Sequence, residues 1–323
     1  RRGAVAAART AAVRSRSAAP GSLAQLRQKL VEHSNNMQSC TSVCGCGIFQ
    51  CVSFAQHVYC IGYDVWLFNV RGNKYSKSHL FLDTNITSQQ FWSYSFEENG
   101  TKDLPASIDY ILNTTNFPSL HYIGFSMGTT QYFVFLSELP EYNRKILSAH
   151  LMAPVAFLEQ DFYIPPILSS LATNVDWLGV YGLFGPYLQE LTYGLCTVSE
   201  GVAQICNKYW GSALTSDEEL NNPLIGLTQL YNEPAGTSLY TLQHFLQLVL
   251  NGGKFTRMDL GPVKNMRRYG TVNPPEYKLK NVQAPTKFYV GDSDVLTKPK
   301  NVEKVKKSYT FCIRFEKKCI SFL

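Results

Sequence analysis

A single G-x-S-x-G turn at residues 124–128 constrains the fold of this chain more than any other feature. An apolar stretch that begins at Leu120 precedes the turn, and a helix-forming stretch through Leu136 follows it. A strand, a sharp turn and a helix in this order are the context of a nucleophile elbow, in which the central serine points its hydroxyl outward. Gly124 and Gly128 carry no side chain and let strand and helix approach closely. We therefore predict Ser126 as a nucleophile, with a plain structural turn as the alternative.

Apolar strands alternate with helical stretches on both sides of this turn. Tyr63–Val70, Ile146–Met152 and Thr286–Val290 are typical of buried strands, and Leu104–Leu112 has helical spacing with Pro105 in its first turn. This alternation predicts an α/β fold with a doubly wound, mostly parallel sheet.

Residues 157–278 interrupt the alternation. From Phe162 to Leu195 the only charged residues are Asp176 and Glu190, while aromatic residues, leucine, glycine and proline are frequent. Such a segment is either a packed helical insertion or a lipid-facing surface. We expect a helical cap over residues 157–278, between a first core part at 53–156 and a second core part at 279–309. Residues 1–52 are an atypical segment that we expect to be disordered, and residues 310–323 are an atypical tail.

The formal net charge of +6 does not indicate a nucleic-acid partner. Residues 1–30 hold seven Lys and Arg and no acid, and residues 298–323 hold eight Lys and Arg and two acids. The remaining middle of the chain is therefore acidic and offers no basic patch, which argues against nucleic acid. The sequence has no run of 18 apolar residues, so we expect no transmembrane helix.

The nine cysteines and three sequons bear on metal binding and compartment. Five cysteines crowd the start of the chain, at positions 40, 44, 46, 51 and 60, but their spacing fits no usual zinc pattern, so we predict no metal. Three N-x-S/T triplets within thirty residues favour the secretory route and predict glycosylation at Asn85, Asn99 and Asn113.

An acid after the last predicted strand, either Asp292 or Asp294, is placed like the acid of a hydrolase triad.

Eight stretches of the chain resemble the animal acidic lipases, the group of gastric and lysosomal acid lipases with many insect members. Among them are GYDVWLFNVRGNKYS from Gly62, YIGFSMGTT from Tyr122, and VGDSDVLTKPKNV from Val290. The other five are DLPASIDYIL, LMAPVAF, AGTSLYTLQHFLQ, GKFTRMDLG and NPPEYKLKNV, all in the family's order between about Ser53 and Val305.

The resemblance implies an α/β-hydrolase with a cap, a lipase acting on carboxylic esters of acylglycerols or sterols without a cofactor. It also implies a lipid droplet or micelle surface that is met through the cap, and a secreted or lysosomal location. Ser126 falls on the family's nucleophile, Asp294 on its acid, and the backbone N–H of Met127 on one oxyanion donor. Cys196 and Cys206 fall near the family's cap disulfide.

The chain departs from the family at both ends. The six histidines, at positions 33, 57, 79, 121, 150 and 244, all precede Asp294, although the family's triad histidine follows its acid. The family's His-Gly-Leu segment before Ser53, which supplies the other oxyanion donor, is not found. We expect that both ends are lost or replaced and that the chain as written is nearly inactive. The alternative is a non-catalytic lipid-binding or yolk-type relative.

Overall fold

A computed structural model describes most of the chain from residue 62 onward. The described residues are 12–14, 58–59, 62–73, 75–159, 166–183, 193–206, 236–291, 294, 297–308 and 312–317. The first five cysteines, His33, His57 and Asp292 lie outside these ranges, as does almost all of the predicted segment 1–52.

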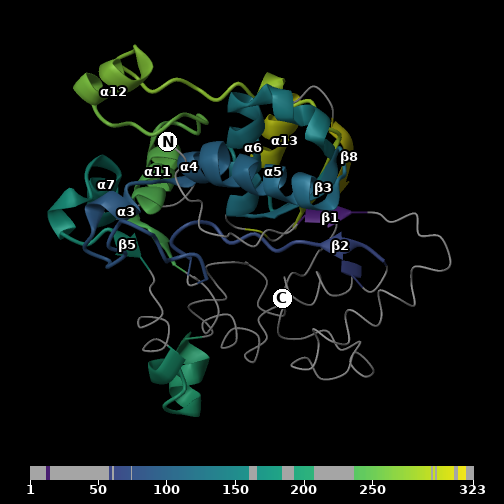
Figure 1. The fold of residues 1–323 in the computed structure, drawn as a ribbon. Helices are drawn as coiled ribbons and strands as arrows, with labels where there is room; N and C mark the ends of the chain where they lie inside the picture. The colour runs from purple at the N-terminus through teal and green to yellow at the C-terminus, as the bar shows by residue number, and fades with distance from the viewer. Residues whose placement is uncertain are drawn as a thin grey trace.

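The main sheet has six strands in the order β2-β1-β3-β4-β7-β8. Its strands are β1 (Ala12–Arg14), β2 (Asp64–Val65), β3 (Leu120–Phe125), β4 (Ile146–Met152), β7 (Thr286–Val290) and β8 (Cys312–Lys317). Figure 1 labels β1, β2, β3 and β8 of this sheet. Strands β3, β4, β7 and β8 run parallel, and β1 pairs antiparallel with both β2 and β3. The bounds predicted for β4 and β7 are confirmed.

One face of this sheet is covered by helices α5 (Leu104–Thr115), α6 (Met127–Glu138) and α13 (Pro299–Lys307). Tyr122, Leu151 and Phe288 point to this face and join the side chains of these helices in one buried cluster. Helix α6 is buried on almost every side, because its residues 129–137 all lie in the interior. The opposite face, which carries His121, His150 and Tyr289, is only half-buried in the described part of the chain.

The described part of residues 157–278 consists mainly of helices, with a two-stranded sheet. It comprises α7 (Pro166–Thr173), α11 (Leu239–Leu250), α12 (Pro262–Tyr269), helical residues 193–196 and 200–206, and the pair β5 (Gly182–Leu183) and β6 (Thr237–Ser238). Helices α7 and α11 lie together beside α3 (Gln89–Trp92) and β5, to one side of the sheet (Figure 1). Leu248, Phe255 and Tyr277 nevertheless belong to the same buried cluster as the sheet.

Two segments differ from the predicted elements. The predicted buried strand Tyr63–Val70 is a strand only at Asp64–Val65, and its residues are half-buried or exposed. Its neighbour β1 is three residues long and pairs with only Asp64 and Val65 of this segment, so the residues that flank these two have no ladder partner in β1. The tail predicted as atypical contributes β8, which pairs parallel with β7.

Candidate active site

Ser126 occupies a strained turn between β3 and α6. Its backbone has φ 48° and ψ −115°, a left-handed conformation that costs a non-glycine residue about 1–3 kcal/mol. The backbone around it is bonded: the N–H of Ser126 donates to the carbonyl of Met152 at 3.0 Å, and its carbonyl accepts from the N–H of Thr129 at 2.9 Å. Strain at one serine between a strand and a helix is the geometry that an exposed nucleophile requires.

The two glycines of the turn have different surroundings. A β-carbon on Gly124 would lie 2.9 Å from a ring carbon of Tyr122 and 3.1 Å from the backbone carbon of Gly128. A β-carbon on Gly128 would meet nothing closer than the Tyr122 hydroxyl, at 3.9 Å. The predicted close approach therefore depends on Gly124, and Gly128 is not required for it.

Met127 is the first residue of α6, immediately after Ser126. The first N–H groups of a helix have no acceptor one turn earlier, and they carry the positive end of the helix dipole. The Met127 N–H is thus of the kind that stabilises an anion beside the serine hydroxyl.

Asp294 follows the carboxyl end of β7, and Ser126 follows the carboxyl end of β3. Both strands run parallel to β4, which lies between them, so the two residues share one edge of the sheet. Strands β3 and β7, which lead to these residues, are two strand spacings, or about 10 Å, apart in the sheet. The Asp294 carboxylate accepts hydrogen bonds from the N–H of Thr297, at 2.7 Å, and from its hydroxyl, which fixes the acid.

The four described histidines each have a local bonding role. His244 on α11 is fully buried, contacts Ser95 Oγ at 3.0 Å through Nδ1 and the Thr256 carbonyl at 3.0 Å through Nε2, and stacks on Phe96. Burial lowers the pKa of His244 to about 4. His79 Nδ1 accepts from the N–H groups of Phe81 and Leu82 at 3.1 and 3.0 Å.

His121 and His150 belong to a polar chain across the half-buried sheet face. His121 Nδ1 lies 2.8 Å from Ser148 Oγ, Ser148 Oγ lies 3.3 Å from His150 Nε2, and His150 Nδ1 lies 2.8 Å from the Tyr289 hydroxyl. Burial lowers the pKa of both imidazoles. Among the residues that the structure describes, no histidine is hydrogen-bonded to Ser126.

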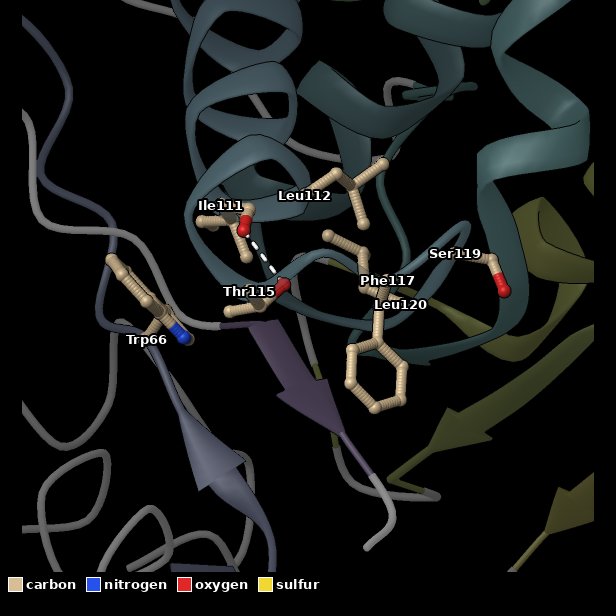
Figure 2. A pocket seen from close by; sticks show the side chains of 7 residues that line it. All are labelled: Trp66, Ile111, Leu112, Thr115, Phe117, Ser119 and Leu120. Atoms are coloured by element: carbon tan, nitrogen blue, oxygen red, sulfur yellow. Dashed lines mark hydrogen bonds between the residues drawn. The ribbon is translucent and has the colours of Figure 1, made fainter.

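A small hollow lies at the amino end of β3, the wrong end of this strand for this chemistry. It holds about 10 Å³ between the end of α5 and the start of β3, and Figure 2 shows Trp66, Phe117 and Leu120 among its lining residues. Thr115 on its wall donates to the Ile111 carbonyl at 2.8 Å. A space of this size admits at most one water molecule, so it is not an ester-binding site.

Cys196 and Cys206 form a disulfide, with their Cα atoms 5.9 Å apart.

The three predicted sequons divide into two groups. Asn85 and Asn113 are exposed, whereas Asn99 is fully buried in a π-helical turn and donates to Asp103 Oδ2 at 3.0 Å. The prediction for Asn99 is therefore wrong for the folded chain, because a glycan cannot be carried by a buried amide.

A partly buried ionic cluster joins α12 to the elements before α5, and most of its contacts leave no signal in the sequence. Glu97 and Glu98, at the start of the helical turns that precede α5, accept from Arg268 on α12 at 3.1 and 2.9 Å. Arg257 pairs with Glu138 at the end of α6 and lies 3.7 Å from Glu97. Ser95 caps α4 (Phe96–Glu98) in a reciprocal capping box with Glu98. The S-x-x-E pattern of this box is the one part of the cluster that a local sequence pattern indicates.

Comparison with known proteins agrees with this geometry. Residues 40–318 match the model of the alpha/beta hydrolase fold family. The chain is 36% identical to Lipase 1 of Drosophila melanogaster over 75% of this chain and 54% of that protein. It is 34% identical to the gastric triacylglycerol lipase of Bos taurus over 75% of this chain and 61% of that protein. It thus spans less than two thirds of the length of these relatives.

Among solved structures, a thermophilic esterase from Thermogutta terrifontis aligns with 85% of this chain and 78% of its own, at 14% identity and a TM-score of 0.43. The match to the family model covers most of the chain and includes the elbow, β4 and β7. The chain therefore belongs to the alpha/beta hydrolase fold family, and its sequence relatives within that family are animal acid lipases.

Proposed function

We propose that this protein is a lipase-type serine hydrolase that cleaves carboxylic esters of acylglycerols or sterols. The strained backbone of Ser126, held between β3 and α6 at the edge of the sheet that also carries Asp294, is the observation that supports this proposal most directly. The lipase relatives support the class of substrate.

In the proposed reaction, the Ser126 hydroxyl attacks the ester carbonyl and forms a tetrahedral oxyanion that the Met127 N–H stabilises. A histidine takes the serine proton and passes it to the leaving alcohol, while Asp294 holds that imidazole. Water then hydrolyses the acyl-enzyme by the same route and frees Ser126.

The histidine of this reaction is not among the described ones, because each of these four contacts other partners. His57, outside the described residues, is the first candidate within the chain, since it precedes the segment that contains β2. The alternative function is that of a non-catalytic lipid-binding or yolk-type protein that keeps the fold of a lipase.

Two exposed apolar loops support contact with a lipid droplet or micelle surface. Leu80 and Phe81 are 69% and 84% exposed in a turn whose N–H groups donate to His79 Nδ1, and Trp177 is 59% exposed on the second loop. The loops lie side by side, because the N–H groups of Tyr181 and Gly182 both donate to the Ile86 carbonyl, at 2.7 and 3.0 Å. Trp177 belongs to residues 157–278, so the proposed cap takes part in this surface.

We also propose a secreted or lysosomal location. The disulfide between Cys196 and Cys206 and the exposed sequons at Asn85 and Asn113 fit an oxidising, glycosylating compartment. No helix in the described parts of the chain has the length and apolar character that crossing a bilayer demands.

A fluorophosphonate probe tests the enzymatic proposal on the chain as it stands. The expected result is labelling of Ser126 that disappears in Ser126→Ala, with p-nitrophenyl butyrate hydrolysis that stays low because no described histidine is placed to serve as the base. Labelling at another residue, or labelling that persists in Ser126→Ala, contradicts the assignment of the nucleophile. Emulsion binding without any serine labelling would favour the non-catalytic alternative.

A further inference from the structure

Two adjacent buried threonines connect the elbow to the loop that leaves β4. The Thr129 hydroxyl donates to the Ser126 carbonyl at 2.6 Å and accepts from the N–H of Val155 at 2.8 Å. The Thr130 hydroxyl donates to the Val155 carbonyl at 2.8 Å. Both threonines are completely shielded from solvent, and Val155 is 6% exposed.

The two bonds to Val155 serve backbone groups that have no partner in a helix or a sheet. Strand β4 ends at Met152, so the N–H and carbonyl of Val155 lie beyond the ladder and inside the protein. A buried backbone group without a hydrogen bond is costly, and the two hydroxyls satisfy both groups of this residue. The Thr129 position needs a side chain that donates and accepts at once, which a hydroxyl does and an apolar side chain of the same shape does not.

The bonds also link two strained residues. Ser126 and Ala153 both have φ 48°, and Ala153 is tied to β7 because its N–H donates to the Tyr289 carbonyl at 2.9 Å. Ser126 in turn donates to Met152, the residue before Ala153, at 3.0 Å. A strained conformation persists only where its surroundings over-determine it. The Thr129 hydroxyl bonds directly to the strained serine and to the loop two residues after the strained alanine.

We propose that Thr129 is a positioning residue for Ser126. Its hydroxyl holds the nucleophile elbow and the β4 exit loop in one fixed arrangement, and the Thr130 hydroxyl secures the loop side of the same contact. This inference rests on the proposed function of Ser126 as a nucleophile. The β4 exit loop leads toward residues 157–278, so the same hydroxyl fixes the point at which the proposed cap departs from the sheet.

The test compares Thr129→Val, which keeps the shape and removes the hydroxyl, with Thr129→Ser, which keeps the hydroxyl. Thr286→Val is the matched control. The Thr286 hydroxyl is also fully buried and contacts the Ala284 carbonyl at 2.9 Å and the Tyr132 hydroxyl at 3.2 Å, but it lies at the start of β7, at the opposite edge of the sheet from Ser126.

Two quantities are measured on the full chain: the second-order rate of fluorophosphonate labelling of Ser126, and amide hydrogen exchange of the peptides that contain Ser126 and Val155. In Thr129→Val we expect labelling to slow at least tenfold and both peptides to exchange at least tenfold faster. Thr129→Ser should stay within about threefold of the wild type in both, and Thr286→Val should leave labelling and both peptides unchanged.

Wild-type labelling and exchange in Thr129→Val would overturn the proposal, as would an equal loss in Thr286→Val, which would indicate general destabilisation. If the wild type does not label at Ser126, the proposed function fails, and the exchange rates alone decide whether Thr129 holds the elbow. If Thr129→Val does not fold, Thr130→Val takes its place. It should speed exchange of the Val155 peptide at least threefold, and unchanged exchange would reject the proposal.

Discussion

At the scale of single residues, the elbow shows which parts of a short motif carry physical constraint. Both glycines of a G-x-S-x-G pattern look equivalent in the sequence, but only Gly124 lies where a β-carbon has no room. Tyr122 cannot yield, because it is buried, stacks on Tyr132 with ring centroids 4.9 Å apart, and donates from its hydroxyl to the Gly128 carbonyl at 2.8 Å.

We predict that Gly124→Ala lowers the free energy of unfolding by about 1–3 kcal/mol, the usual cost of an overpacked interior. Gly128→Ala should leave stability unchanged or raise it by up to about 1 kcal/mol, because alanine is the better helix former and its methyl group finds open space. Urea denaturation of both variants measures the difference. Equal losses would show that the two glycines are constrained alike.

The sequons provide a second prediction at this scale. Asn85→Gln and Asn113→Gln should each remove one glycan from the protein expressed in a secretory host, because both amides are exposed. Asn99→Gln should leave the glycan mass unchanged, since Asn99 is buried and bonded to Asp103. Mass spectrometry before and after enzymatic deglycosylation gives the count. A glycan on Asn99 in the folded protein would contradict the structure.

At the scale of elements, the sequence was most informative where local pattern and tertiary pairing agree. Strands β4 and β7 have the predicted bounds because each is an apolar run with a long neighbour in the sheet. Tyr63–Val70 has the same apolar character but pairs with a three-residue strand, so the pattern predicted a strand that the sheet does not provide. Contacts such as Arg268 with Glu97 join residues about 170 positions apart, and no local pattern encodes them.

Helix α12 is attached to the elements before α5 through Arg268. Arg268→Met should lower the free energy of unfolding by about 1–2 kcal/mol, because it leaves the buried carboxylates of Glu97 and Glu98 with fewer partners. The value is at the low end for a buried pair, since the Arg268 side chain is 43% exposed and water screens it.

Arg267→Met is the matched control, because Arg267 is the neighbouring exposed residue on the same helix. Its effect should stay within about 0.5 kcal/mol. Thermal and urea unfolding of the two variants provide the comparison. If Arg267→Met destabilises the protein as much as Arg268→Met, the ionic contact with Glu97 and Glu98 is not what holds α12.

At the scale of the whole molecule, two features matter for function. The exposed apolar loops bear on binding to a lipid surface, and the buried titratable groups bear on the pH range in which the fold is stable. Leu80 and Phe81 are exposed in a turn that hydrogen bonds to His79 stabilise, whereas all aromatic residues of α4 and α6 are fully buried. A folded protein rarely exposes adjacent large apolar side chains without a partner surface.

We predict that the double variant Leu80→Ser, Phe81→Ser binds triolein emulsions stabilised by phosphatidylcholine at least tenfold more weakly. Full burial of one such side chain is worth about 1.5–3 kcal/mol, so losing two exceeds a factor of ten. Tyr110→Ser is the control, because Tyr110 is 62% exposed on α5, away from these loops. Flotation of the emulsion with bound protein measures the affinity. Equal binding by the double variant and the wild type would remove these loops from the lipid surface.

The last prediction concerns stability against pH and rests on His244. Burial lowers the pKa of this imidazole from 6.5 to about 4, although the hydrogen bond to the Thr256 carbonyl and the charge of Glu98 oppose the shift. Between about pH 6.5 and pH 4, His244 therefore binds a proton in the unfolded chain but not in the folded chain. Stability is complete above about pH 6.5 and falls as the pH drops toward 4. Because one pKa unit corresponds to about 1.4 kcal/mol, the loss through His244 is about 3 kcal/mol.

His244→Gln should flatten this dependence between pH 6.5 and 5 while lowering stability at pH 7, since glutamine bonds to Ser95 and Thr256 but does not stack on Phe96. A smaller slope should remain from His121 and His150, whose pKa values burial also lowers. Below about pH 4.5 both proteins should lose stability through Glu98. Burial raises the pKa of this carboxyl, but the Ser95 N–H and Arg268 outweigh burial and hold it below 4.5.

Urea unfolding at half-unit pH steps separates these contributions. An unchanged slope in His244→Gln would show that this imidazole is not the group that resists protonation in the folded chain.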